Sequence, residues 1–260
     1  MSAIAKIASW NVNSINIRQQ QLYDWVDLNR PDVIAIQETK TTDDNFPNGF
    51  VDDLGYQCYF YGQKSYNGVA FLTKDNLASS VKTDILKLDD SQARTISLVY
   101  NNTLIVNVYV PNGSSLDSDK YPYKLKFLSA LHSYLKAQQQ KYNNIIVLGD
   151  FNIAPQDIDC HDPEKWHAST IASPEVRDSF DEIIELGFTD TFRQLNPEST
   201  EFSWWDYRQA AFRRNLGLRI DLILASTSLI EGIITSSIDK TTRKLERPSD
   251  HAPVVLEFKL

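Results

Sequence analysis

The chain has 260 residues, and its 26 Lys and Arg residues against 34 Asp and Glu residues give a formal net charge of −8. An apolar content of 42% exceeds that of disordered chains, and 9 Gly with 10 Pro residues exclude a collagen-like or low-complexity sequence. Two cysteines, Cys58 and Cys160, exclude a disulfide framework and a thiolate metal cage, and the acidic balance taken alone argues against a nucleic-acid-binding protein.

Short apolar runs rich in Val, Ile, Leu and Tyr recur along the chain between Asn, Gly, Pro or Asp residues, which is typical of β-strands. In chain order, strands are expected at 4–10, 33–37, 69–73, 94–100, 103–110, 144–148, 220–225 and 254–259. Asn101 and Asn102 separate two of these runs, and Asn tolerates a left-handed backbone, so we expect a hairpin there.

Amphipathic stretches with apolar residues at helical spacing lie between these runs. Helices are expected at 18–29, 121–140 and 174–186. The third has Ser173 as a candidate N-cap, Pro174 at its first position and Gly187 just after its end. This order of elements predicts stacked layers of sheet and helix in a single domain over residues 1–260.

The start of the chain lacks the pattern of a targeting segment. Lys6 interrupts the apolar run before Trp10, so this run is too short for a signal peptide. No run approaches the roughly 18 apolar residues of a membrane span. We therefore expect a cytoplasmic protein with no membrane partner.

Polar side chains suited to catalysis lie at the ends of the apolar runs. They are Asn11 and Asn13 after the first, Glu38 after the second, Tyr109 near the end of the fifth, Asp150 and Asn152 after the sixth, Asp221 in the seventh, and Asp250-His251 before the last. Strand ends on one rim of a layered scaffold commonly collect catalytic groups. A single Asp in such a place is usually a cap or turn residue, but capping does not require this mixture of carboxylates, amides, a phenol and an imidazole.

The mixture favours metal-assisted chemistry on a phosphate. Its ligands are mainly hard oxygen atoms, with no Cys and one His, which selects Mg²⁺ or Mn²⁺ over zinc or copper. Mg²⁺ is typically held by one or two carboxylates together with phosphate oxygens of the substrate, and Glu38 and Asp250 are the best candidates. A phosphodiester would then be attacked in line by a deprotonated water.

The remaining members of the set have matching roles. Asp150 is a candidate general base, with Asn152 orienting the attacking water. His251 is a candidate hydrogen-bond donor to a phosphate oxygen, and pairing of its other ring nitrogen with Asp221 would favour the imidazolium. Tyr109 and Asn11 would add donors to the phosphate.

A family resemblance is carried by segments that span the chain. They are SWNVNSI (9–15), IQETK (36–40), NGVAFLTK (67–74), VYVPNG (108–113), LGDFNIAP (148–155), SWWDYR (203–208), GLRIDLIL (217–224) and PSDHAPV (248–254). With them the sequence resembles the exonuclease III-type apurinic/apyrimidinic (AP) endonucleases of the endonuclease/exonuclease/phosphatase superfamily. The segments up to LGDFNIAP are partly shared with DNase I-like nucleases, sphingomyelinases and inositol-polyphosphate phosphatases, whereas SWWDYR followed by FRRNLGLRIDLIL is much more specific to the DNA-repair branch.

The resemblance implies an α/β fold of the DNase I-like type: a four-layered sandwich with two packed mixed β-sheets flanked by helices. It implies a Mg²⁺-dependent phosphodiesterase of base excision repair, with Mn²⁺ as a substitute. Without a sequence signal for oligomerisation, we expect a monomer. The substrate would be double-stranded DNA, cut 5′ of abasic sites to leave a 3′-hydroxyl, or trimmed at blocked 3′ ends by 3′→5′ exonuclease and 3′-phosphatase activity. Carried over position by position, the resemblance implies that Glu38 and Asp250 bind metal, that Asp150 is the general base, and that Asn11 and Asn152 support metal, water or phosphate. It also implies that the Asp221–His251 pair and Tyr109 stabilise the attacked phosphate. With the analysis of the residues themselves, the expected site comprises metal-binding Asn11, Glu38, Asp150, Asn152, Asp250 and His251; catalytic Tyr109, Asp150, Asn152, Asp221 and His251; and substrate-binding Asn13, Trp204, Arg208, Arg213, Leu218 and Ile220.

The expected sugar pocket has a structural alternative. Trp204, Leu218 and Ile220 match positions that read a flipped-out abasic sugar, which costs less to extrude than an intact nucleotide. Apolar residues of this kind also pack in ordinary cores. Trp166, in the loop after LGDFNIAP, is likewise either a DNA contact or a packed aromatic side chain.

A basic stretch follows SWWDYR. It comprises Arg208, Arg213, Arg214 and Arg219 against Asp206. If this stretch is functional, its arginines would bind DNA phosphates near the site. If it is not, it would simply be a charged face exposed to solvent.

Two other functions are compatible with the same residues. One keeps the fold but cleaves another phosphate ester, such as an inositol phosphate or sphingomyelin. The other is a module that docks DNA or a protein without chemistry. Competent residues occupy every inferred catalytic position, which favours an enzyme over the module.

Overall fold

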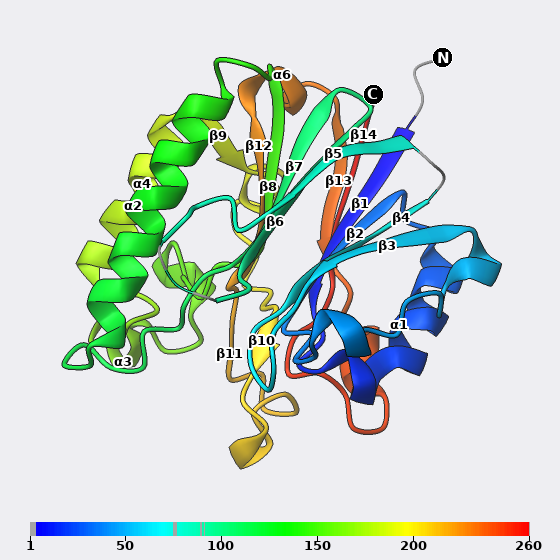
Figure 1. The fold of residues 1–260 in the computed structure, drawn as a ribbon. Coiled ribbons are helices and arrows are strands. Elements are labelled where there is room, and N and C mark those ends of the chain that lie inside the picture. Colours follow the sequence, from blue (N-terminus) through cyan, green and yellow to red (C-terminus); the bar gives the residue numbers. More distant parts are fainter. Residues whose placement is uncertain (1–3, 75–76, 89, 91, 260) are drawn as a thin grey trace.

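The computed structural model describes residues 4–74, 77–88, 90 and 92–259, and two six-stranded sheets dominate it (Figure 1). In spatial order the first sheet consists of β13 (Ile233–Ile238), β14 (Val254–Lys259), β1 (Ile4–Asn11), β2 (Val33–Gln37), β4 (Val69–Lys74) and β3 (Tyr56–Tyr61). The second consists of β5 (Ala78–Thr83), β6 (Thr95–Tyr100), β7 (Thr103–Tyr109), β8 (Asn144–Asp150), β12 (Asp221–Ser226) and β9 (Phe188–Asp190). The short strands β10 (Trp204–Trp205) and β11 (Gly217–Leu218) form a separate ribbon.

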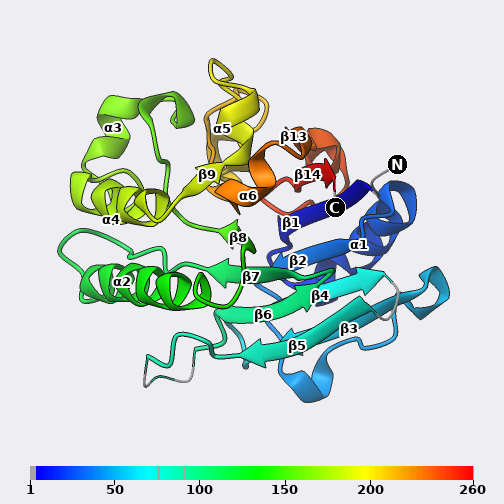
Figure 2. The same ribbon diagram turned by 90° about the horizontal axis from the view of Figure 1, so that it is seen from above.

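The α-helices are α1 (Ile15–Asn29), α2 (Lys120–Gln138), α3 (Pro163–His167), α4 (Pro174–Glu185), α5 (Thr191–Leu195) and α6 (Thr227–Ile230). The three long ones, α1, α2 and α4, cover the outer faces of the two sheets. Figure 2 shows α2 and α4 on one side of the sheets and α1 on the other. Within the described ranges, no helix is both long and apolar enough to cross a membrane.

Three hydrophobic clusters separate the layers. The central one lies between the sheets and contains Ile7 of β1 and Ile146 of β8, while a second joins Val147 of β8 to α2 and α4. The third joins Ala8 of β1 to α1. Adjacent residues of β1 and β8 thus point into different cores, which explains why β8 reads as a continuous apolar run over residues 145–148. This arrangement confirms the four-layered α/β sandwich.

Both sheets are mixed. The pairs β1–β2 and β7–β8 are parallel, whereas β1–β14, β2–β4, β6–β7 and β8–β12 are antiparallel. The predicted hairpin joins β6 to β7, with Tyr100 opposite Thr103. Asn101 and Asn102 adopt φ values of 45° and 61°, the left-handed pair that a two-residue turn between twisted strands requires.

All the predicted strands are present, with ends that differ by at most two residues. The first predicted helix begins three residues earlier than expected, at Ile15 rather than Arg18, and the others agree closely. Ser173 caps α4 as predicted, its side chain accepting a hydrogen bond from the Val176 amide. Sequence patterns did not predict β3, β5, β9, β10, β11, β13, α3, α5 or α6. The single domain over 1–260 stays a prediction, and residues 1–3 and 260 lie outside the described ranges.

Candidate active site

The ends of β1, β2, β7 and β8 and the start of β12 lie at the edge of the sheets near β10 and β11 (Figure 1). Because β1 and β2 run parallel, Asn11 at the end of β1 lies beside the end of β2, which Glu38 follows. Parallel pairing also sets Tyr109 of β7 opposite Asp150 of β8. The antiparallel neighbour β12 begins with Asp221 opposite Asp150. Sheet register therefore gathers groups that lie far apart in the sequence.

A cavity of about 230 Å³ opens at this edge. Its lining comprises Glu38, Tyr109, Asn112, Asp150, Asn152, Trp166, Ile171, Trp204, Leu218, Ile220, Asp250 and His251. Most of the residues expected in the site are in this set. Asn11, Asn13 and Asp221 lie behind the lining, in contact with its carboxylates or with His251.

Glu38 and Asp150 are linked by the buried amide of Asn11. Asn11 Nδ2 donates to Glu38 Oε1 and to Asp150 Oδ2, both at 2.9 Å. Lys40 Nζ lies 2.7 Å from Glu38 Oε2. Burial by itself would raise the pKa of Glu38, but the charge of Lys40 and the Asn11 hydrogen bond outweigh it and lower the pKa. Glu38 is thus held as a carboxylate, ready to bind a cation.

Asp150 is a carboxyl group with a strongly perturbed pKa. Burial, together with the nearby charges of Asp221 and Glu38, raises its pKa to about 7, against the opposing effect of His251. Its Oδ1 accepts a hydrogen bond from the Asn152 backbone amide at 2.9 Å. A buried carboxyl group that titrates near neutrality has the properties of a general base.

His251 is paired with Asp221, as expected. Its Nδ1 lies 3.0 and 2.9 Å from the two oxygens of Asp221, and its Nε2 lies 3.8 Å from Asp150 Oδ2. Burial lowers the pKa of His251, but the carboxylates of Asp221 and Asp150 overcome this effect and raise the pKa to about 10. The imidazole is therefore charged at neutral pH, with both ring nitrogens acting as donors.

Tyr109 presents a protonated hydroxyl. Burial, and then the charges of Glu38 and Asp150, raise its pKa well above the ordinary value for tyrosine. The Arg94 guanidinium lies 4.8 Å from the centre of the ring. Because the hydroxyl stays protonated at neutral pH, it can donate a hydrogen bond to a bound anion.

Asp250 is held by two donors. Its Oδ1 accepts from Asn13 Nδ2 at 2.8 Å and its Oδ2 from Trp204 Nε1 at 3.0 Å. Burial would raise its pKa, but the charge of His251 and these two hydrogen bonds lower it. Among the described residues, the possible ligands that lie within 4.8 Å of one another are Glu38, Asp150 and His251. Asp250 lines the same cavity but is not a member of that group.

One wall of the cavity is apolar. Leu218 of β11 lies opposite Trp204 of β10, and Leu218 packs with Ile220 and Ile171 in a small hydrophobic cluster. The rings of Trp166 and Trp204 meet edge to face, 6.3 Å apart. The site therefore combines charged groups with an apolar surface.

Several lining or contacting residues were not predicted. Lys40 and Asn112 belong to the motifs IQETK and VYVPNG, so the motifs could have signalled them. Asn112 Nδ2 donates to Asn152 Oδ1 at 3.1 Å. Ile171 carried no sequence signal, because a lone Ile in a loop does not reveal which cavity it faces.

The basic stretch divides in the structure. Arg208, Arg213 and Arg214 are exposed, and Arg208 Nη2 lies 2.7 Å from Asp206 Oδ2. The expectation that Arg219 lies on the same DNA-gripping face is wrong. Its side chain is 1% exposed and pairs with Asp159 and Asp190, because its neighbours in the chain belong to the buried wall.

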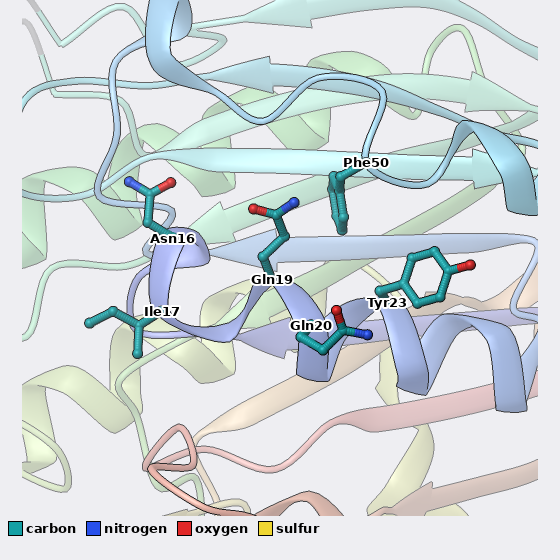
Figure 3. A pocket seen from close by; sticks show the side chains of 6 residues that line it. All are labelled: Asn16, Ile17, Gln19, Gln20, Tyr23 and Phe50. Carbon is teal, nitrogen blue, oxygen red and sulfur yellow. The ribbon is translucent and has the colours of Figure 1, made fainter.

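A second hollow lies over the first two turns of α1. Figure 3 shows its lining, which consists of Asn16, Ile17, Gln19, Gln20, Tyr23 and Phe50, with Phe50 across from the helix. These side chains include no carboxylate, thiol or imidazole. The hollow therefore lacks the charged ligands and the imidazole that the first cavity combines.

Comparisons with known proteins identify the family of this chain. Residues 8–251 match the model of the Endonuclease/Exonuclease/phosphatase family. Exodeoxyribonuclease III of Haemophilus influenzae is 37% identical over 98% of this chain and 100% of its own length. The 3′-5′ exonuclease NExo from Neisseria meningitidis has a similar structure, with a TM-score of 0.95, 42% identity, and coverage of 98% of this chain and 100% of that one. An AP endonuclease from Archaeoglobus fulgidus matches with a TM-score of 0.94, 35% identity, and coverage of 98% and 100%. The chain belongs to the Endonuclease/Exonuclease/phosphatase family.

Proposed function

We propose that this chain is a Mg²⁺-dependent DNA-repair phosphodiesterase that cuts double-stranded DNA 5′ of abasic sites and leaves a 3′-hydroxyl. It also trims blocked 3′ ends, as a 3′→5′ exonuclease and 3′-phosphatase. The observation that carries the proposal is the joining, in one cavity, of Glu38, Asp150 and His251 with an apolar wall. Among its relatives, a Neisseria protein described as the 3′ phosphatase NExo was solved bound to a product DNA hairpin, at 41% identity and a TM-score of 0.95.

The donor set fits a hard divalent cation. The ligand atoms of Glu38 and Asp150 lie close together, and no cysteine lines the cavity among the described residues. We assign metal binding to Asn11, Glu38, Asp150, Asn152 and Asp250. His251 is charged at neutral pH and would repel a cation, so it serves better as a donor to phosphate. Bound there, Mg²⁺, or Mn²⁺ in its place, would supply charge that neutralises the phosphate.

The side chains of the chain divide the remaining work. Asp150 takes a proton from water as the water oxygen bonds to phosphorus, and Asn152 orients that water. The bond from phosphorus to the 3′ oxygen breaks, and that oxygen takes a proton from solvent water to become the 3′-hydroxyl, while Asp150 returns its proton to solvent. The His251 imidazolium, held by Asp221, and the Tyr109 hydroxyl donate to the phosphate oxygens, on which negative charge accumulates.

The apolar wall supports selectivity for a sugar without a base. Trp204, Leu218 and Ile220 offer no hydrogen-bonding pattern that would read a base edge. The cavity, at about 230 Å³, is below the size of pockets for drug-like ligands. An abasic sugar costs less to extrude than an intact nucleotide, so such a pocket selects the lesion without reading sequence. Asn13, Arg208 and Arg213 are assigned to the flanking DNA.

One assay tests the function. A duplex with a single abasic-site analogue is incubated with the protein in Mg²⁺ and, separately, in EDTA. We expect incision 5′ of the lesion, a 3′-hydroxyl product, and no product in EDTA. Absence of incision in Mg²⁺, or incision that EDTA leaves unchanged, would contradict the proposal. Preferred turnover of an inositol phosphate in competition would identify another phosphoesterase.

Asp150→Asn is the matched variant. Loss of a general base lowers rates by about 10²–10⁴. We expect a loss in that range for single-turnover incision, with affinity for abasic duplex largely kept. A wild-type protein that binds duplex but is as inert as the variant would support a docking module instead.

We also propose that the protein is a monomer and that it works in the cytoplasm. Light scattering during gel filtration would test the oligomeric state, and fractionation of cells would test the location.

A further inference from the structure

Arg18 is a buried arginine whose hydrogen bonds leave its own helix. It lies on α1 and is 7% exposed. Its Nε donates to the Arg247 carbonyl at 3.2 Å, and its Nη2 donates to the Pro248 carbonyl and to the Tyr207 hydroxyl, both at 3.0 Å. Its Nη1 donates to the Asn13 carbonyl. Within the described part of the chain, no carboxylate lies within ion-pair distance of Arg18.

These contacts join three segments that are distant in the sequence. They are the turn at Asn13, the loop before Asp250, and the loop after β10 that carries Tyr207. The Tyr207 hydroxyl donates to the Pro248 carbonyl at 2.9 Å and accepts from Asn13 Nδ2 at 3.3 Å. A planar guanidinium presents its donors in a fixed fork, so it sets the relative positions of its acceptors more strictly than an ammonium would.

Asn13 transmits this restraint to the carboxylates. Its Nδ2 donates to Asp250 Oδ1 at 2.8 Å, and its backbone amide donates to Asn11 Oδ1 at 3.0 Å. The amide of Asn11, fixed in this way, donates to both Glu38 and Asp150. Asn13 also has a left-handed φ of 45°, a conformation that the surrounding contacts must maintain.

We propose that Arg18 and Tyr207 are positioning residues for the metal site, which act by holding Asn13 against the loop that carries Asp250. The inference rests on the proposed function, because it presupposes a divalent cation at these carboxylates. A buried arginine without a carboxylate partner is costly, and its charge by itself opposes a nearby cation. An electrostatic role would therefore make removal of Arg18 tighten metal binding, whereas a positioning role makes removal weaken it.

The experiment compares Mn²⁺ binding to the metal-free full-length protein by electron paramagnetic resonance, with Mn²⁺ alone as the probe. Loss of residues that orient metal ligands typically weakens affinity by about 10–100-fold. We expect Arg18→Met to weaken Mn²⁺ binding at least about 10-fold and Arg18→Lys to weaken it less. Tyr207→Phe, which changes no charge, should weaken it in the same direction. The Mg²⁺ needed for half-maximal incision should rise in parallel.

Arg30→Met is the matched control. Arg30 directly follows the last residue of the same helix, has a half-exposed side chain, and bonds to Asp27 and to the Leu54 carbonyl, away from the site. Its loss should leave Mn²⁺ binding unchanged. Unchanged or tighter binding in both Arg18→Met and Tyr207→Phe would overturn the inference.

Circular dichroism of the variants and the behaviour of the wild-type protein distinguish a failure of this inference from a failure of folding or of the proposed function. Circular dichroism establishes that each variant is folded at the assay temperature. If Arg18→Met does not fold, Arg18→Lys and Tyr207→Phe decide, since Tyr207 is 52% exposed and loses one oxygen atom. A wild-type protein that binds no Mn²⁺ would overturn both this inference and the proposed function. A wild-type protein that binds Mn²⁺ and cuts abasic duplex, beside variants that bind Mn²⁺ equally well, would overturn this inference alone.

Discussion

His251 and Asp150 have raised pKa values for different electrostatic reasons. Burial opposes the charge of His251, and the Asp221 and Asp150 carboxylates overcome it to raise the pKa to about 10. Burial acts with Asp221 and Glu38 to raise the pKa of Asp150 to about 7. At neutral pH the imidazole is charged while the carboxyl group is close to its titration point. One site thus holds a cationic hydrogen-bond donor and a carboxyl group that can accept a proton, the two groups that the proposed mechanism uses.

The first prediction at this scale concerns the titration of His251. In metal-free protein, with a chelator present, NMR should place the midpoint near 10, and Asp221→Asn should lower it toward the ordinary value of 6.5. Because folding raises this pKa, the pair stabilises the fold fully below about pH 6.5, and that contribution is lost as pH rises through 10. His251→Gln assigns the resonance. A midpoint that Asp221→Asn leaves unchanged would contradict the stated cause.

At the scale of elements, the close approach of β8 to β7 depends on Gly149. A Cβ atom at Gly149 would lie 1.9 Å from the Val108 carbonyl oxygen, and its φ of +145° is one that side chains rarely adopt. A glycine is therefore needed directly before Asp150, because a side chain there would clash with the backbone of β7. It lets the two strands bring Tyr109 and Asp150 to the same edge.

The wall formed by β11 and the start of β12 is anchored by a buried ion cluster. Arg219 Nε and Nη2 lie 2.7 and 3.0 Å from the two oxygens of Asp159, and its Nη1 lies 2.7 Å from Asp190 Oδ2. Arg193 also pairs with Asp159. Arg219 stands between Leu218 and Ile220, so the cluster fixes both sides of the apolar wall.

Arg219→Met should destabilise the fold by about 3–5 kcal/mol, because removing one member of a buried pair leaves charges without compensation. Urea unfolding followed by circular dichroism would measure this. Arg208→Met is the control, since the Arg208–Asp206 pair lies at the surface and its loss should stay within about 0.5 kcal/mol. Equal effects of the two substitutions would refute the distinction.

At the scale of the whole molecule, the net charge of −8 conceals an uneven distribution. Four of the acids, Glu38, Asp150, Asp221 and Asp250, lie in or behind the cavity, where a bound cation would offset them. Exposed arginines are concentrated in the loop between β10 and β11 beside it. The overall charge therefore does not exclude DNA binding, which depends on the local field at the contact surface.

Arg213→Ala should weaken binding to abasic duplex and lower the salt slope of the affinity by about 0.9, the value for one phosphate contact in B-DNA. Fluorescence anisotropy over a range of salt, with a chelator to prevent cutting, would measure this slope. Lys136→Ala, on the exposed face near the end of α2, removes an equal charge and should leave the slope unchanged. An Arg213→Ala slope equal to that of wild type would make Arg213 part of an ordinary solvated face.

The sequence by itself determined the central strands, the three long helices and the composition of the polar set. Runs such as 144–148 are apolar throughout because both faces of β8 are buried, and Ser173 marks the start of α4 by local hydrogen bonding. The motifs at the strand ends predicted most of the residues that line the cavity, because these strand ends lie together at one edge of the sheets. A local sequence pattern is sufficient to predict a feature whose physical cause is itself local.

Only the tertiary structure decided the features that depend on contacts between segments distant in the sequence. The edge strand β5 is largely exposed and polar, and half of the residues of β13 are exposed. Both strands form because β6 and β14 offer hydrogen-bonding partners, so their own sequence patterns are weak. Arg219 reads as a surface cation beside other arginines, yet Asp159 and Asp190, 60 and 29 positions away, bury it in an ion cluster. The same holds for the hydrogen bonds by which Arg18 and Asn13 reach the carboxylates. Burial and pairing depend on which segments the fold brings together, and no short stretch of sequence contains that information.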